Sequence, residues 1–234
     1  MGYTKISAPS LTDLFVQQIE NMILSGELAI GERLLPAREL SLKMGVSRPV
    51  ISAGLVELEK LGFVEIVPRQ GVYVCDYRRK GSVETLVAIM RYNGGALRKN
   101  EVRSLLETRD ALECLCIRLV LEHAGTAELE QLAPILDKIA GAKDPDEAAE
   151  HVYTFHHELA MMSGNVLMPL LYNSFYPQSV YLWSLSCKRG GIQPLYEIKL
   201  RLYSALLNRD LDSAIEQTHS VMLAAINDLS FYGA

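Results

Sequence analysis

The strongest constraint on the fold of this chain lies in residues 10–75, where three helical segments precede two short strand-like segments. Ser10 begins the first helix, and Asp13 follows three residues later, which is the spacing of a capping box. Apolar residues then recur at helical intervals until Gly26, whose tolerance of a left-handed backbone suits it to end a helix. The first helix is therefore predicted between Ser10 and Gly26.

The next two helices are separated by a short turn. A helix is predicted over residues 36–44, and Gly45 is placed to end it. Ser47 is placed to cap the following helix, which is predicted to run to about residue 61. Pro49 lies in the first turn of that helix, where a missing N–H costs little.

Two strand-like segments follow at residues 63–67 and 72–75, with residues 68–71 as the tip between them. Three helices and a hairpin, with a short glycine-containing turn between the second and third helices, is the order of a winged helix-turn-helix. In that fold the third helix enters the major groove, and the wing reaches an adjacent groove or the phosphates. Double-stranded DNA is therefore the predicted partner of this region.

The charge of the chain is distributed unevenly. The whole chain carries a net charge of −5, which by itself argues against a nucleic-acid partner, but residues 1–80 have +1 and residues 81–234 have −6. A DNA-binding surface must therefore depend on a few placed side chains. Arg78, Arg79 and Lys80 form a small basic run, interpreted either as a solvated hinge or as phosphate contacts beside the wing.

From residue 82 onward the sequence has a helical period and no strand pattern. Long amphipathic segments predict an antiparallel helical bundle, so the fold class is mostly α, with a small β-hairpin as the wing. We expect a DNA-binding domain over residues 1–76, a linker over 77–83, and a helical domain over 84–234, to which the family resemblance given below assigns effector binding and dimerisation. The predicted helices cover residues 82–92, 100–124, 126–141, 145–163, 166–187, 193–208 and 211–230.

Several classes of protein find no support in the sequence. No apolar run of about 18 residues and no signal-peptide pattern is present, so we expect no membrane contact and a cytoplasmic location. No Walker loop, GxGxxG or HExxH motif occurs, and an enzyme is not expected. The four cysteines form no CxxC pair and are expected to be buried free thiols: Cys75, Cys114, Cys116 and Cys187.

Residues 31–74 resemble the DNA-binding domain of GntR-family regulators. The motif GVSR at 45–48 carries the match, together with the glycine, leucine and arginine positions around it. Looser motifs at 101–113, 155–165 and 202–222 resemble the helical effector domain of the FadR branch of that family. The resemblance covers nearly the whole chain and implies a bacterial transcription regulator that binds a DNA operator as a homodimer.

The resemblance assigns DNA contacts to particular residues. Arg38 and Arg48 match the family's DNA-contacting arginines, and Arg48, in the first turn of the recognition helix, can fork onto a guanine edge. For Arg38 the alternative is a surface salt bridge. Where the family usually has a further arginine this chain has Ser52, so the operator is expected to differ from the common one. The expected contacts are Arg38, Ser47, Arg48, Pro49, Ser52, Gln70 and Gly71.

The resemblance also bears on metal binding, because many members hold a divalent metal with one Asp and three His. The corresponding positions here are Val152, His156, Lys199 and His219, so two of the four ligands remain. An ammonium at a ligand position opposes a dication electrostatically. No metal cofactor is therefore expected, and any bound metal would depend on His156 and His219.

Without a metal, an anionic effector of carboxylate or acyl type is expected to bind directly, with Lys199 in place of the cation. Arg109 lies on an apolar stripe of its helix and needs an anion, either an internal acid or the effector. His219 is either a core histidine or an effector contact. The apolar run 167–183 serves either the bundle core or a cavity. The expected effector contacts are Arg109, His156, Lys199 and His219.

The favoured function is a regulator whose operator affinity changes when a small effector binds one conformation better than another. One alternative is a DNA-binding dimer without an effector response, whose DNA affinity no metabolite would change. The other is a metal-dependent helical hydrolase, which would require bound metal.

Overall fold

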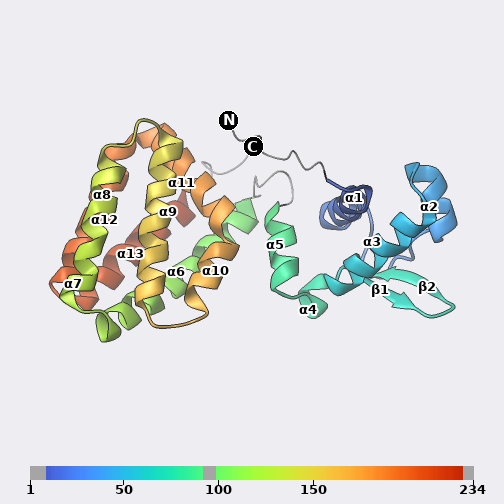
Figure 1. Cartoon of the computed structure of the whole chain (residues 1–234), viewed down its shortest axis with the longest axis horizontal. Coiled ribbons are helices and arrows are strands. Elements are labelled where there is room, and N and C mark those ends of the chain that lie inside the picture. Colours follow the sequence, from blue (N-terminus) through green and yellow to red (C-terminus); the bar gives the residue numbers. More distant parts are fainter. Residues whose placement is uncertain (1–8, 92–98, 229–234) are drawn as a thin grey trace, which may run out of the picture. The chain divides into compact units, whose positions relative to one another are not determined.

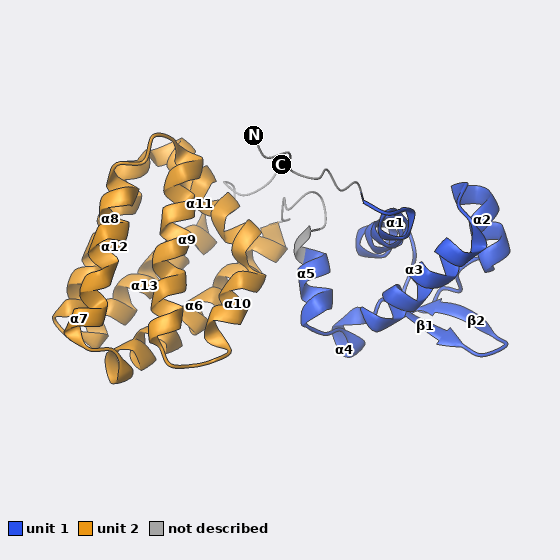
Figure 2. Cartoon of the chain, in the orientation of Figure 1, with its two compact units in different colours: residues 1–94 blue, residues 95–234 orange. Residues whose placement is uncertain are grey.

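The computed structural model describes residues 9–91 and 99–228. The chain divides into two compact units, residues 1–94 and 95–234 (Figure 2). Within the described residues, the first unit contains the two strands and the second is helical, as predicted (Figure 1). None of the helices in the described ranges combines the length and the apolar character needed to cross a bilayer.

Three helices begin the first unit: α1 (Leu11–Ser25), α2 (Ala37–Met44) and α3 (Arg48–Lys60). The capping box predicted at the start of α1 is present, since the Ser10 hydroxyl accepts from the Asp13 N–H and the Asp13 carboxylate accepts from the Ser10 N–H. Gly45 ends α2 with a left-handed φ of 67°, which opens the short turn into α3. The predicted helix-turn-helix is confirmed.

The wing is a two-stranded antiparallel hairpin of β1 (Val64–Val67) and β2 (Gly71–Val74). Its register pairs Val64 with Val74 and Val67 with Gly71. The segment before α2 also joins it, because the Leu34 N–H donates to the Val72 carbonyl. The apolar faces of these elements form one core: Phe15, Val16, Ile19, Ile23, Leu34, Leu40, Ile51, Leu55, Leu58, Phe63, Val64 and Val74.

Residues 77–91 form two helices, α4 (Tyr77–Lys80) and α5 (Val83–Arg91), that pack on the first unit. Thr85 is buried, and its hydroxyl donates to the carbonyl of Leu61. Ala88 packs against the same core. The predicted linker at 77–83 and the start of the predicted helical domain therefore belong structurally to the first unit, because partly buried apolar side chains of α4 and α5 pack against its core.

The crossing of α1 and α3 depends on Gly54, which is buried in the middle of α3. A Cβ atom added at Gly54 would lie 2.2 Å from Cδ1 of Phe15, so only glycine permits this close approach. Helix α3 is thereby held directly against the phenyl ring of Phe15 in α1.

We predict that Gly54→Ala destabilises the first unit by about 1–3 kcal/mol, because the overlap with Phe15 outweighs the gain in helix propensity of about 1 kcal/mol. Chemical denaturation followed by circular dichroism measures the change. Ala53→Ser, at an exposed position of the same helix, is the control. A Gly54→Ala protein as stable as the wild type would contradict the packing, and Phe15→Leu should restore part of the loss.

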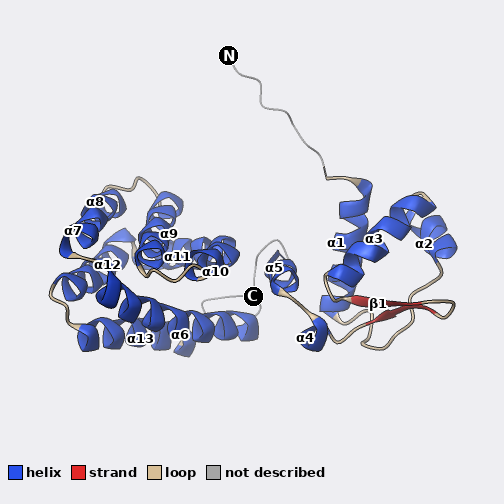
Figure 3. Ribbon diagram, turned by 60° about the horizontal axis from the view of Figure 1, so that its bottom comes forward, coloured by secondary structure: helices blue, strands red, loops and turns tan. Residues whose placement is uncertain are grey.

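The second unit is a bundle of helices around a long α9. Helix α9 packs against α8, α10 and α11, while α6 runs along α13 (Figure 3). The elements are α6 (Lys99–His123), α7 (Thr126–Leu129), the 3₁₀ turn η2 (Glu130–Leu132), α8 (Ala133–Ala140), α9 (Pro145–Met162), α10 (Met168–Ser174), α11 (Tyr176–Gly190), α12 (Ile192–Leu207) and α13 (Leu211–Asn227).

Two of the predicted single helices are wrong. The segment 126–141 is divided into α7, η2 and α8, and the segment 166–187 is divided into α10 and α11. Both later helices, α8 and α11, carry a proline in their first turn, Pro134 and Pro177. A proline ring clashes with the carbonyl of the preceding turn, so it begins a helix more readily than it continues one. The end of the last predicted helix, at residues 229–230, lies outside the described residues.

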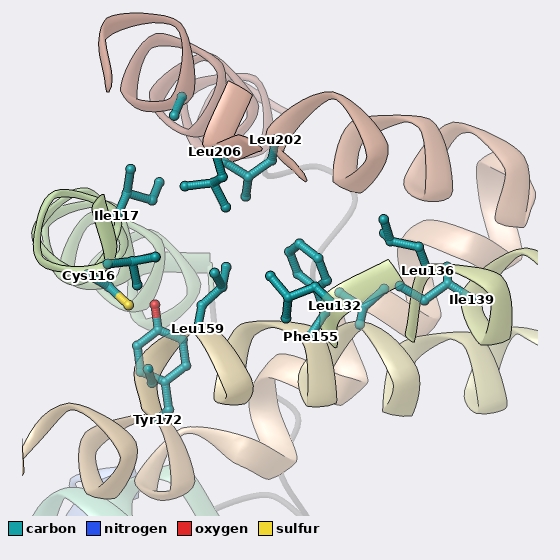
Figure 4. Close-up of a cluster of buried hydrophobic side chains, with 14 of the residues drawn as sticks. Cys116, Ile117, Leu132, Leu136, Ile139, Phe155, Leu159, Tyr172, Leu202 and Leu206 are labelled. Carbon is teal, nitrogen blue, oxygen red and sulfur yellow. The ribbon is translucent and has the colours of Figure 1, made fainter. Parts of the chain in front are cut away.

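The core of the second unit joins α6, α8, α9, α10 and α12 (Figure 4). In Figure 4 the Tyr172 hydroxyl points toward the Cys116 sulfur, and burial raises the pKa of that thiol to about 12. All four cysteines are free thiols, as predicted; Cys114 is half-buried and the other three are buried. This apolar core surrounds a charged cluster, which is the second part of the site described below.

Candidate DNA interface and effector cavity

The predicted recognition arginines stand on the helix-turn-helix with no acidic partner. Arg48 is the first residue of α3 and Arg38 lies in the first turn of α2, and both are exposed. Neither forms an ion pair within residues 9–91 and 99–228, so the salt-bridge alternative for Arg38 finds no support there. Two guanidinium groups are thus available for an external anion.

The other basic residues at this end of the chain behave differently. Arg78 pairs with Asp76 at 2.7 Å, and Lys80 pairs with Glu65 at 2.7 Å. Arg79 also lies 3.4 Å from Asp76. The basic run 78–80 is therefore held by carboxylates of its own unit, which favours a structural role over phosphate contacts.

Three further unpaired cations were missed by the sequence analysis. Arg33 lies against the wing, with its Nε 2.7 Å from where a Cβ of Gly71 would stand. Arg69 stands at the wing tip with a left-handed φ of 62°, and Lys43 is exposed in the last turn of α2. None of the three has an acidic partner among the described residues. Their positions on the wing and on α2, rather than any motif, could have identified them.

The remaining predicted DNA contacts are all at the surface or the wing tip. Pro49 and Ser52 are exposed on α3, Gln70 is exposed at the tip, and Gly71 has a φ of 131°. Ser47 holds the predicted N-cap position of α3, but its hydroxyl makes no capping hydrogen bond. Because the hydroxyl is not engaged in a cap, it remains accessible to a phosphate oxygen.

The second unit contains a different kind of site, a cluster of buried charges. Among the described residues, Arg109, Glu113, His156 and Lys199 are the only buried side chains of the Asp, Glu, His, Lys and Arg types. Each is 5% exposed or less, and they come from three helices, α6, α9 and α12. Charged groups are almost never fully buried unless they are paired, so their gathering requires an explanation.

Glu113 is at the centre of this charge cluster. Its carboxylate lies 2.5 Å from Nη2 of Arg109, one turn earlier on α6, and 3.7 Å from Nδ1 of His156. The Trp183 ring covers the other side: the imidazole of His156 stacks on it at 5.2 Å and 12°, and the Arg109 guanidinium lies 4.4 Å from its centre. Arg109 thus has the internal acid that the sequence analysis left open.

Burial sets the protonation states in the cluster. It lowers the pKa of His156 to about 3 despite the attraction of Glu113, and it lowers the pKa of Lys199 to about 8. Burial alone would raise the pKa of Glu113, but attraction to His156, Arg109 and Lys199 outweighs it and the pKa is lowered. At pH 7 the imidazole is therefore neutral, and two cations face one carboxylate.

Lys199 is the cation of the cluster without a direct hydrogen bond to a carboxylate. Its ammonium makes no hydrogen bond or ion pair with any residue in the described ranges, and it lies 5.8 Å from the centre of the Trp183 ring. An uncompensated buried charge is costly, so an anion that reaches it is strongly favoured.

Arg109, Trp183 and Lys199 all line a cavity of about 510 Å³ between α6, α11, α12 and α13. The remaining walls are mainly apolar, from Leu106, Leu182, Leu195, Ile198, Val221, Met222, Ala224 and Ala225. An ion pair between Arg189 and Asp228, 3.1 Å long, also borders it. Apolar walls with a few convergent polar groups are typical of small-molecule sites.

The expected metal-ligand positions do not form a metal site. Val152 is buried in the apolar core, and His219 is exposed and lies 2.8 Å from Asp110 of α6. His219 does not line the cavity described above, and its side chain is 53% exposed. Among the described residues no group of three His, Cys, Asp or Glu side chains could hold a metal ion, and Lys199 would oppose one beside His156.

Two residues of this site were missed by the sequence analysis. Glu113 stands four residues after Arg109, the spacing at which side chains of one helix meet, so this signal was present. Trp183 belonged to the apolar run 167–183, whose division between core and cavity required the tertiary structure. Trp183 and Leu182 line the cavity, whereas Met168 is part of the core.

Comparison with known proteins identifies a known family in each of the two units. Residues 12–74 match the family described as bacterial regulatory proteins of the gntR family, and residues 104–224 match the FCD domain. This chain is a GntR-family transcription regulator with an FCD domain. The family assignment makes the helix-turn-helix a DNA-binding element and excludes an enzyme as the favoured class.

Curated relatives of this GntR-family chain are also regulators. The chain is 28% identical to the HTH-type transcriptional regulator LutR of Bacillus subtilis over 193 residues, which covers 79% of this chain and 85% of LutR. It is 33% identical over 144 residues to the fatty acid metabolism regulator protein of Shewanella amazonensis, covering 61% and 58%. A solved structure of Lar, which controls the agr system of Listeria monocytogenes, shares the fold, with a TM-score of 0.64 at 15% identity over 96% of this chain and 99% of Lar.

We predict that the stability of the second unit falls as the pH is lowered from about 7 toward 4. His156 has a pKa of about 3 when folded and about 6.5 when exposed, so between these values only the unfolded chain binds the proton. Its contribution is fully present above the unfolded pKa and is lost at up to about 1.4 kcal/mol per pH unit below it.

Urea denaturation across this pH range measures the effect. His156→Leu should flatten the profile, whereas the same substitution at the half-buried His151 of α9 should not. Parallel profiles for wild type and His156→Leu would show that the buried imidazole does not titrate as the structure indicates.

Proposed function

We propose that this GntR-family regulator binds its operator as a homodimer in the cytoplasm. Its affinity for the operator changes when an anionic effector enters the cavity lined by Arg109, Trp183 and Lys199. The observation that carries the proposal is the unpaired, 5% exposed Lys199 ammonium at an apolar cavity. No metal is needed in this scheme, since Lys199 already supplies a cation at a position where the family has a metal ligand.

The cavity favours an effector with one negative charge and an apolar body. The cluster contains Arg109 and Lys199 against the single carboxylate of Glu113, which leaves one positive charge to be neutralised. The Trp183 face and the aliphatic walls favour an apolar body, and the other charges at the border, Arg189 and Asp228, pair with each other. A small carboxylic acid or short acyl compound satisfies both requirements.

Effector binding would act through helices that the cavity joins. Its lining comes from α6, α11, α12 and α13, so an occupant contacts four helices at once and stabilises the arrangement that fits it. An effector shifts DNA affinity only by its differential affinity for two conformations. Two recognition helices presented by a dimer would sense such a change through their spacing on a pseudo-palindromic operator.

For the DNA interface, we predict that Arg48→Ala weakens binding to a duplex selected by the wild-type protein from a random pool by about 1–3 kcal/mol. Fluorescence anisotropy at fixed salt measures the affinity. Lys60→Ala is the matched control, because Lys60 stands at the other end of α3 and is paired with Glu57 at 3.5 Å. Normal binding by Arg48→Ala would mean that the start of α3 does not enter the groove.

For the effector site, we predict that hexanoate changes the fluorescence of Trp183, the only tryptophan in the chain, and that hexylammonium does not. Lys199→Met should weaken hexanoate binding by about tenfold or more, while folding is retained because an unpaired buried cation is removed. The exposed Lys138→Met is the control. Equal binding of the anion and the cation would contradict an anionic effector.

A further inference from the structure

The surroundings of Lys199 favour a nucleophilic amine as well as an ion pair. The residue is only 5% exposed, its amino group makes no hydrogen bond within the described residues, and it borders a cavity large enough for a small organic molecule. Arg109, beside the same Trp183 ring, repels its charged form. A lysine desolvated next to another cation is the environment in which the amine becomes a nucleophile toward carbonyl carbon.

We propose that Lys199 captures its effector covalently, as a reversible imine with an oxo acid. This inference rests on the proposed effector site and specifies its chemistry. The carboxylate of the oxo acid would be held by the guanidinium of Arg109, and the carbonyl carbon would face Nζ of Lys199. Both groups border the same cavity and the same aromatic ring, so one small molecule can reach both.

The reaction balances without a further reagent. The ammonium of Lys199 first releases a proton to water, and the neutral amine attacks the carbonyl carbon. A C–N bond forms, the C=O π bond breaks, and the oxygen takes the proton that the nitrogen loses, which gives a carbinolamine. The released proton then returns to the hydroxyl group, the C–O bond breaks and water leaves, so the overall change is ammonium plus ketone to iminium plus water. The iminium keeps the positive charge that Lys199 carried, and the attraction to Glu113 is retained.

The surroundings favour this capture. The pKa of Lys199, lowered to about 8, leaves about one amine in ten unprotonated at pH 7, against fewer than about one in a thousand for an exposed lysine. A second, small cavity, lined by Glu113, Lys199 and Thr218, has room for about one water molecule beside the amine. The departing water therefore has room next to Lys199, in a cavity that Glu113 and Thr218 line together with apolar residues.

The test is reductive trapping on the full-length protein with 2-oxohexanoate as the probe. Sodium borohydride fixes an imine as a stable amine, so the chain should gain the mass of the acid minus one oxygen atom. Peptide mapping should place this adduct on Lys199 at about tenfold or more above the exposed Lys138. Hexanoate, which lacks the carbonyl, should leave no adduct.

Lys199→Arg distinguishes the covalent step from simple ion pairing. Arginine keeps the cation, so hexanoate should still change Trp183 fluorescence, but the adduct with 2-oxohexanoate should disappear. If hexanoate binds the wild type while Lys199 is labelled no more than Lys138, the imine is wrong and the anionic effector site stands. If neither acid binds and no adduct forms, both the imine and the effector site are overturned.

Discussion

The ion pair between Arg109 and Glu113 makes the charged interior of the second unit possible. Without the carboxylate, two cations would be buried beside Trp183 with no counter-ion, at a cost that apolar packing could not offset. The two residues stand one turn apart on α6, so a single helix places both members of the pair. His156 and Lys199 approach the same carboxylate from α9 and α12.

The DNA-binding unit depends on the opposite arrangement, cations that are left without partners. Its exposed basic residues divide into those held by carboxylates and those that have none among the described residues. The unpaired ones lie on α2, at the start of α3 and along the wing, where a helix-turn-helix meets DNA. A chain with a net charge of −5 can therefore present a local positive surface without being basic as a whole.

Local signals predicted most of the fold, and tertiary contacts explain what they missed. The capping box at Ser10 and the turn at Gly45 stand in the sequence and are present in the structure. The break between α10 and α11 was missed because apolar periodicity was followed past Pro177. The family resemblance pointed to both Lys199 and His219, and only Lys199 lines the cavity, because a resemblance fixes a position along a helix more firmly than the direction in which its side chain points.

The net positive charge of the cluster of Arg109, Glu113 and Lys199 also supplies the free energy by which an anionic effector can act. An apolar bundle that retains one unneutralised cation is less stable than the same bundle with the charge paired, so an anion lowers the free energy of the form that encloses it. That gain is largest for the helix arrangement in which Arg109 and Lys199 both reach the ligand. A conformation in which either cation is turned to solvent gains less, and the difference between the two is the free energy available to change the spacing of the recognition helices.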